Sequence, residues 1–278
     1  MVGAKEQKLA VEYVQKAHKV SERRACSVLN APRTVIRYRP VDKGDESIKA
    51  SIKEVVEKRP RFGAPRVHQM LRRRGIKINH KRTERLYKEL GLSLKKKKRK
   101  KYKSELRIEP DVPIAKNEVW AMDFVHDALA AGKKIRGLTI IDICTKECPA
   151  IEVDFSLSSF KVITVLERLK ENGGIPKFIK VDNGPEFISL ALDKWASDNN
   201  VGLYFSRRGK PTDNANIESF NGKFRDECLN VNWFTSLEMA KRICEEWRKD
   251  YNEERPHSSL AYKTPKEFAE ELKFMVAS

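Results

Sequence analysis

Three acidic residues, each in a different kind of local sequence, constrain this chain more than any other feature. Asp182 follows a short apolar and β-branched run, Phe178–Val181, and precedes Asn-Gly-Pro, which ends a strand. Glu218 lies in residues 215–229, where apolar side chains recur at helical spacing. Asp123 lies inside an aromatic and β-branched run typical of a strand. The three carboxylates can form one site only if an α/β fold gathers them.

Gathered carboxylates suit metal-assisted displacement at phosphorus. Hard oxygen ligands hold Mg²⁺ or Mn²⁺, and two metals clamp the attacking and leaving oxygens. Taken singly, each acid also has an ordinary interpretation: Asp182 as a loop cap, Glu218 as a solvated helix charge and Asp123 as an edge-strand charge. Asp127 falls on the same side of a straight strand as Asp123, because side chains alternate. Three acids therefore rival the first set as metal ligands: Asp127, Asp142 and Glu186.

The combined motif resembles the DDE core of retroviral-type integrases and insertion-sequence transposases. It reads Asp123, then Asp182-Asn-Gly-Pro-Glu-Phe, then Asp213-Asn-Ala-x-x-Glu218-Ser-Phe, with thirty-five residues between Asp182 and Glu218. The family has Lys or Arg seven residues after the glutamate, here Arg225, about two helical turns away and on the same face. The resemblance implies that Asp123, Asp182 and Glu218 are catalytic and hold two Mg²⁺ ions, for which Mn²⁺ can substitute, while Arg225 contacts DNA phosphate.

The order of expected elements in residues 113–278 predicts an α/β domain with a mixed sheet. Three strand runs in a meander are followed by alternating helices and strands. The expected strands are residues 119–129, 134–143, 150–155, 178–181 and 201–205, and the expected helices are residues 158–172, 185–199, 215–229 and 236–252. This order is similar to the RNase H-like fold of the DDE family, a mixed five-stranded sheet with flanking helices. In that fold Asp123 and Asp182 are expected at neighbouring strand ends, with Glu218 reaching them from a helix.

The basic charge of the chain lies in its first hundred residues. Residues 1–100 contain 30 Lys and Arg against 10 Asp and Glu, whereas residues 101–278 contain 27 against 29. A basic arm beside a nearly neutral body indicates a polyanion-binding region, although such charge can also serve solubility alone.

Small all-α units are predicted ahead of the core. Residues 1–40 form an N-terminal helical segment, read either as a helix-turn-helix or as a plain three-helix packing unit. Residues 46–92 resemble the helix-turn-helix DNA-binding domain that precedes the core of OrfB-type insertion-sequence transposases. Residues 93–112 form a basic linker, whose Lys-Lys-Lys-Lys-Arg-Lys-Lys run cannot pack and would grip phosphates without sequence preference.

Candidate DNA contacts lie in three places. The start of the expected recognition helix, the basic loop before residue 215 and the Glu218 helix each carry some of them. They are Lys81, Arg82, Arg85, Arg207, Arg208, Lys210, Asn214, Lys223 and Arg225.

The C-terminal stretch from Tyr251 to Pro265 repeats a signature of the same family. His257, within it, is read as structural or DNA-contacting rather than as a general base, because phosphoryl transfer on two metals needs no histidine. A helical tail is expected around this stretch.

Five scattered cysteines fit a reducing compartment rather than a disulfide framework, and Cys144 and Cys148 lack the histidines of a zinc site. The sequence has neither a signal stretch nor a run of about 18 apolar residues. We therefore expect a soluble intracellular protein without a membrane partner, and the resemblance implies a bacterial cytoplasmic, nucleoid-associated one.

The sequence thus predicts a transposase that performs metal-dependent DNA strand cleavage and strand transfer at insertion-sequence ends. Its partners would be double-stranded DNA of the element's terminal repeats and of the target, further copies of itself on DNA, and an upstream-frame (OrfA) protein or fusion. Two alternatives remain: a non-catalytic DNA-binding modulator of a longer fused transposase, and an RNase H-type nuclease, which shares the fold.

Overall fold

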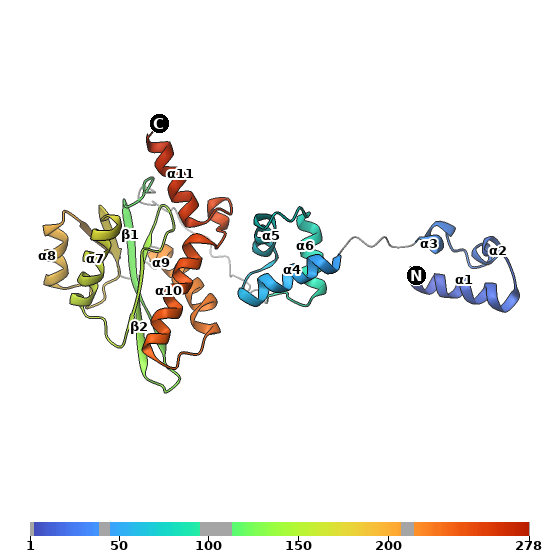
Figure 1. Ribbon diagram of the computed structural model, residues 1–278, viewed down its shortest axis with the longest axis horizontal. Coiled ribbons are helices and arrows are strands. Elements are labelled where there is room, and N and C mark those ends of the chain that lie inside the picture. The colour runs from blue at the N-terminus through green and yellow to red at the C-terminus, as the bar shows by residue number, and fades with distance from the viewer. Residues whose placement is uncertain (1–2, 39–44, 95–112, 207–213, 278) are drawn as a thin grey trace. The chain divides into compact units, whose positions relative to one another are not determined.

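A computed structural model describes residues 3–38, 45–94, 113–206 and 214–277. By their internal contacts the residues divide into two compact units, 1–48 and 49–278, with the boundary inside a helix. Figure 1 shows the chain coloured from its N-terminus to its C-terminus. The expected basic linker lies almost wholly outside the described residues, as does the loop that contains Arg207, Arg208 and Lys210.

The first unit is a small helical cluster. Its helices are α1 (Ala4–His18), α2 (Glu22–Val28) and α3 (Arg33–Arg37). Ser21 caps α2, since its hydroxyl accepts a hydrogen bond from the Arg24 backbone N–H. Val11, Ala25 and Ile36 are buried together between the helices. The packing explains the apolar positions of the sequence, whereas the assignment of a helix-turn-helix here stays a prediction.

Three further helices form the segment at residues 46–92, as expected. They are α4 (Asp45–Lys58), α5 (Ala64–Arg73) and α6 (His80–Glu89). Asn79 caps α6 by accepting from the Lys81 backbone N–H, and Gly75 ends the preceding helical stretch with φ of 80°. The apolar side chains of this group that are fully buried include Ile52, Val55, Val67, Leu71 and Leu86.

A five-stranded mixed sheet forms the centre of the rest, in the order β3-β2-β1-β4-β5. The strands are β1 (Val119–Ala128), β2 (Lys134–Asp142), β3 (Ala150–Asp154), β4 (Phe178–Val181) and β5 (Gly202–Phe205). β2 is antiparallel to both β1 and β3, while β4 is parallel to both β1 and β5. The predicted meander and mixed sheet are therefore confirmed.

Helices cover both faces of the sheet, as Figure 1 shows. One face packs on α7 (Ser159–Gly173) and α8 (Leu190–Asp198), and the other on α9 (Ala215–Glu227) and α10 (Leu237–Glu253). Because side chains alternate along β1, Trp120 and Met122 lie in the first layer, and Ala121 and Val125 in the second. Asp123 shares the alternation of the second group, so its carboxylate faces α9.

Two details differ from the sequence predictions. The helix expected at residues 185–199 begins only at Leu190, where Ser189 caps it by accepting from the Leu192 backbone N–H. Residues 184–188 form a turn instead, in which the Phe187 backbone N–H donates to the Gly184 carbonyl. Towards the C-terminus, the expected helical tail contains a second helix beyond the one expected at residues 236–252, namely α11 (Pro265–Ala277).

Candidate active site

The three acids of the motif lie on three neighbouring elements. Asp182 directly follows β4, and Glu218 lies in the first turn of α9. The parallel register pairs Trp120 with Ile179 and Ala121 with Lys180, so its continuation brings Asp182 level with Asp123. Asp123 itself lies in the middle of β1 rather than at its end, because β1 extends well past β4.

The carboxylate of Asp123 is half-buried and anchored at both oxygens. Its Oδ1 accepts from the Phe124 backbone N–H at 2.7 Å, and its Oδ2 accepts from the Asn221 side-chain amide at 2.8 Å. Burial raises the pKa of Asp123, and the charges of Asp182 and Glu218 raise it further against the effect of those hydrogen bonds. Asp182 and Glu218 are therefore close enough to Asp123 for their charges to act on its carboxylate.

Asn221 is a site residue that the sequence reading missed. Its Oδ1 lies 2.8 Å from the hydroxyl of Thr139, which donates to it, so its amide nitrogen is turned toward Asp123. Thr139 is fully buried and lies directly opposite Asp123 on β2. The available signal was spacing: Asn221 follows Glu218 by three residues and so shares its helix face.

The loop after β4 is fixed to the sheet by contacts of two side chains. The ring of Phe187 stacks on that of Phe124 with centroids 4.9 Å apart, and the Glu186 carboxylate pairs with Arg136. Asp182 Oδ1 accepts from the Gly184 backbone N–H at 2.9 Å. A Cβ at position 184 would lie 2.9 Å from that same oxygen, closer than real Cβ atoms approach, so the glycine leaves room for the carboxylate.

A shallow cavity of about 300 Å³ opens between β1 and α9. The side chains that give it chemical character are Asp123, Glu218, Asn221 and Arg225. Arg225 lies exposed at its rim and donates to the His126 carbonyl at 2.7 Å. The cavity thus joins two of the three acids to the predicted phosphate-binding cation, while Asp182 lies outside its lining.

The donor set suits a hard divalent cation, because it consists of carboxylate oxygens, and the charges of Asp182 and Glu218 disfavour the ionised form of Asp123 without a counter-charge. Within residues 3–38, 45–94, 113–206 and 214–277, no three acidic, histidine or cysteine side chains are close enough together to hold a metal ion. The acids are adjacent, therefore, without being spaced as a complete coordination shell.

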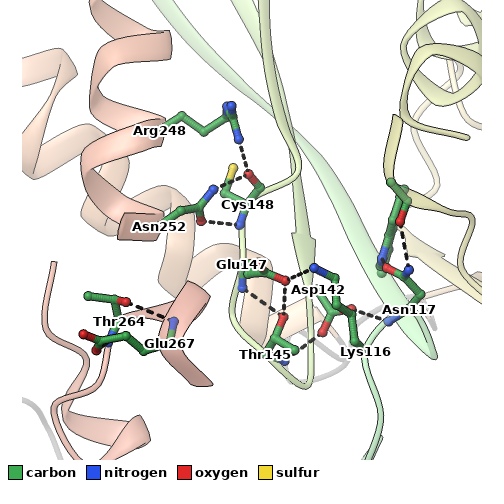
Figure 2. Close-up of polar contacts among 12 residues, drawn as sticks. Lys116, Asn117, Asp142, Thr145, Glu147, Cys148, Arg248, Asn252, Thr264 and Glu267 are labelled. Atoms are coloured by element: carbon green, nitrogen blue, oxygen red, sulfur yellow. Dashed lines mark hydrogen bonds and ion pairs between the residues drawn. The ribbon is translucent and has the colours of Figure 1, made fainter. Parts of the chain in front are cut away.

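The rival acids are engaged elsewhere. Asp142 is almost fully buried and accepts from two backbone N–H groups, those of Asn117 and Thr145, both at 2.7 Å. Figure 2 shows these bonds beside the pair of Lys116 and Glu147. Asp142 therefore holds the turn after β2 against the segment before β1.

The two other rivals also have nearby partners. Glu186 is paired with Arg136, and Asp127 accepts from the backbone N–H of its neighbour Ala128 at 2.8 Å.

Replacing Asp142 with Ala is expected to destabilise the fold by about 2–4 kcal/mol, because two buried N–H groups would lose a charged acceptor. Urea unfolding monitored by circular dichroism measures this loss. The matched control is Asp193→Ala, which removes an exposed acid from α8 and should change stability by less than about 0.5 kcal/mol. An unchanged midpoint for Asp142→Ala would remove the structural explanation and return Asp142 to the set of candidate ligands.

Comparisons with known proteins bear on this arrangement. Two models, both described as "Integrase core domain", match residues 114–211 and 199–265, and a model described as "HTH-like domain" matches residues 43–101. The 31.7 kDa protein of insertion element IS407 from Burkholderia multivorans is 46% identical over 90% of this chain and 91% of its own length. The chain belongs to the insertion-sequence transposases with an integrase core. The transposase of insertion sequence element IS904 from Lactococcus lactis is 28% identical over 80% of this chain and 93% of its own length.

The fold of the transposase core is that of retroviral integrases. The simian T-cell lymphotropic virus intasome in complex with PP2A regulatory subunit B56 gamma contains a chain that matches with a TM-score of 0.50 and 16% identity. The match covers 60% of this chain and 59% of that one. At such identity the likeness establishes the fold alone, and it confirms the expected RNase H-like architecture.

The predicted DNA contacts of this transposase occupy different environments. Lys81, Arg82 and Arg85 lie on α6, where Arg85 pairs with Glu89. Asn214 is buried at the N-cap of α9, and its Oδ1 has no hydrogen-bond partner among the described residues. Arg225 lines the cavity, and Lys223 lies on another side of the same helix.

His257 of the transposase core is buried and structural. Its Nε2 lies 2.9 Å from Arg255 Nη1 and accepts from it, since a guanidinium only donates. Burial and the adjacent Arg255 lower the pKa of His257 to about 2, so the ring stays neutral. The ring also packs edge-on against Tyr251. This buried position agrees with the prediction that His257 does not act as a general base.

The helices described for this transposase are all too short or too polar to cross a bilayer.

Proposed function

We propose that this transposase carries out metal-dependent cleavage and joining of DNA strands at insertion-sequence ends, with Asp123, Asp182 and Glu218 as the catalytic acids. The observation that carries the proposal is the arrangement of the three acids: Asp123 and Glu218 line one cavity with the cation Arg225, and Asp182 lies level with Asp123 on the neighbouring strand. Burial raises the pKa of Asp123, and the charges of Asp182 and Glu218 raise it further. An excess of negative charge would bind divalent metal ions, which in turn bind DNA phosphate.

Asp123, Asp182 and Glu218 would hold two Mg²⁺ ions, with Mn²⁺ able to substitute. When bound, the ions lower the pKa of an attacking hydroxyl and stabilise the departing 3′-oxygen. Asn221 donates to Oδ2 of Asp123 and so fixes the orientation of a carboxylate that lines the cavity. Arg225, at the cavity rim, would bind a phosphate next to the one that reacts.

The reaction is an in-line displacement at phosphorus. The oxygen of water, or of a DNA 3′-hydroxyl, forms a new bond to phosphorus while the bond to the 3′-oxygen of the attacked strand breaks. The proton of the nucleophile is lost to solvent, and the 3′-oxygen leaves. Water as nucleophile gives a nick at the element's end, and the freed 3′-hydroxyl joins that end to target DNA. The partners are accordingly the terminal repeats and target DNA, in an assembly of several copies in the bacterial cytoplasm.

Strand cleavage and joining by the purified chain test the proposal. A labelled duplex carrying the element's end is incubated with Mg²⁺ or Mn²⁺, with and without the upstream-frame protein, beside an RNA–DNA hybrid. Metal-dependent nicking and joining of the duplex supports the proposal. Preference for the hybrid would favour an RNase H-type nuclease, and binding without chemistry in every mixture would favour a non-catalytic modulator.

Asn221→Leu is expected to lower the rate of cleavage by about 10–100-fold, because the partner that orients a metal-binding carboxylate is lost. A raised Mg²⁺ requirement measured in the same assay distinguishes this positioning role from a loss of folding. The matched control Asn230→Leu changes an exposed asparagine just after α9 and should leave the metal requirement unchanged. An Asn221→Leu protein with wild-type metal dependence would show that Asp123 needs no such support.

A further inference from the structure

A second group of charged side chains lies around α9, away from the cavity. Lys223 follows Glu218 by five residues, which places it about 140° around the helix from that acid. Glu227 lies one helical turn after Lys223 and binds Arg66 from α5 and Arg255 from the segment after α10, while Lys146 from the turn after β2 binds Asn216 on the same helix. After burial, the charges of these three cations lower the pKa of Lys223. We call Lys223, Arg66, Lys146 and Arg255 the α9 cation cluster.

One carboxylate faces these four cations, and it is already shared. Glu227 accepts from Arg255 through both of its oxygens, at 2.7 Å each, and from Arg66 at 2.9 Å. The side chain of Arg255 is 2% exposed and that of Glu227 is 9% exposed, so this part of the cluster is shielded from water. Four positive charges against one negative charge leave an excess of three within a half-buried region.

Asp142, whose charge acts on Lys146, lowers that excess to two, and the other groups at the cluster do not reduce it further. His257 is neutral, since it accepts from Arg255. Lys146 donates to the Ile143 carbonyl at 2.6 Å and to the Asn216 side-chain oxygen at 3.1 Å, both uncharged acceptors. Two neighbouring acids are already paired outside the cluster: Asp226 with Arg61, and Glu147 with Lys116.

Lys223 is the cation of the cluster that can still take a ligand. Its ammonium is half-buried and has neither a hydrogen bond nor an ion pair with any residue that the structure describes. An ammonium partly removed from water and surrounded by like charges gains free energy from any anion that reaches it. A phosphodiester oxygen is such an anion, and Lys binds phosphate as a compact point charge.

We infer that the α9 cation cluster is a second phosphate-binding site, in which Lys223 takes a phosphodiester of the DNA backbone outside the cavity of Asp123 and Glu218. The site carries no base-reading group, so it would hold duplex DNA without sequence preference. Because Arg66 belongs to the HTH-like domain and Lys223 to the core, the bound phosphate would lie where these two regions meet. The inference rests on the DNA-binding activity proposed above, and on none of its chemistry.

Binding of the full chain to a labelled duplex without divalent metal tests the inference, because no strand is then cut. We expect Lys223→Gln to weaken binding about 5–10-fold at low salt and to reduce the slope of log K against log salt by about 1. Lys223→Arg should restore both. The matched control is Lys177→Gln, which removes an exposed lysine just before β4, at the opposite end of that strand from Asp182, and should leave the slope unchanged.

Proton uptake gives a readout that a purely structural lysine would not change. Burial first, then the cations Arg255 and Arg66, lower the pKa of Lys223 to about 8. A phosphate placed on the ammonium raises that pKa again, so DNA binding at pH 8 should take up about half a proton. Calorimetry in buffers of different ionisation enthalpy measures this uptake, which should disappear in Lys223→Gln.

The outcomes separate the inference from the proposed function. A wild-type chain that binds no DNA overturns both. A wild-type chain that binds DNA, with Lys223→Gln equal to it in slope and proton uptake, overturns the second phosphate site alone. If inorganic phosphate at constant ionic strength raises the melting temperature of wild type but not of Lys223→Gln, while DNA binding is equal, the site takes free phosphate and the inference about DNA is wrong. Lys223→Gln should itself be at least as thermostable as wild type, because it removes one like charge from the cluster.

Discussion

Replacing Asp182 with Asn, or Glu218 with Gln, is expected to lower DNA strand cleavage and joining by about 10³-fold or more. Loss of one metal-binding carboxylate removes several kcal/mol of transition-state stabilisation, and each 1.4 kcal/mol corresponds to tenfold in rate. Both side chains are exposed and make few packing contacts, so folding should be unaffected. DNA affinity without metal should stay within about twofold of wild type or rise slightly, because a negative charge near the phosphate is removed.

A second measurement links the effect to the site rather than to the assay. The charges of Asp182 and Glu218 contribute to the raised pKa of Asp123, so either replacement should lower that pKa toward its ordinary value. Since an ionised group whose pKa is raised by folding destabilises the folded state above that pKa, the metal-free variants should melt slightly above wild type at pH 7. Stabilisation by added Mg²⁺ should be lost in the same variants.

Asp193→Asn is the matched control, since it removes an exposed carboxylate of the same type from α8. Its cleavage rate and its response to Mg²⁺ should equal those of wild type. Retained cleavage in Asp182→Asn would exclude Asp182 as a metal ligand and would reopen the choice among the acids near the cavity. Loss of DNA binding in that variant would mean that the aspartate acts through the fold instead.

The local sequence was sufficient to predict the strands and most of the helices of the core. The strand expected at residues 119–129 is β1 (Val119–Ala128), and the helix expected at residues 215–229 is α9 (Ala215–Glu227). Each element carries its own signal, either period-two alternation or apolar residues at helical spacing, together with breakers such as Asn-Gly-Pro. The resemblance to DDE enzymes then selected Asp123, Asp182 and Glu218 from many acids.

The polar pairs that support the site could not be predicted in the same way. Asn221 meets Asp123 across 98 positions of sequence, and Glu227 meets Arg66 across 161. No local pattern records such partners, because they depend on how α9 lies against the sheet and against α5. The late start of α8 also depends on a contact between distant residues. The ring of Phe187 stacks on that of Phe124, and the residues before Leu190 form a turn rather than a helix.

Glu227→Gln is expected to destabilise the fold by about 3–5 kcal/mol, the largest loss of stability that the contacts of this chain predict. Arg255 is among the most deeply buried side chains, and its charge is balanced by Glu227 through two hydrogen bonds of 2.7 Å. Removing one partner of a buried ion pair leaves the other charge unsolvated, which costs more than the pair itself contributes. Arg66 would lose its negatively charged partner in the same step.

The position of the midpoint in urea unfolding measures this loss, with Glu246→Gln as the matched control. Glu246 pairs with Arg242 on the exposed side of α10, where both side chains are more than half exposed, so its replacement should cost less than about 0.5 kcal/mol. If the penalty of Glu227→Gln comes from the stranded guanidinium, the double variant Glu227→Gln with Arg255→Met should be more stable than Glu227→Gln alone. Additive losses in the two single variants would mean instead that each side chain acts through its own packing, and that the pair does not hold α9 to the segment after α10.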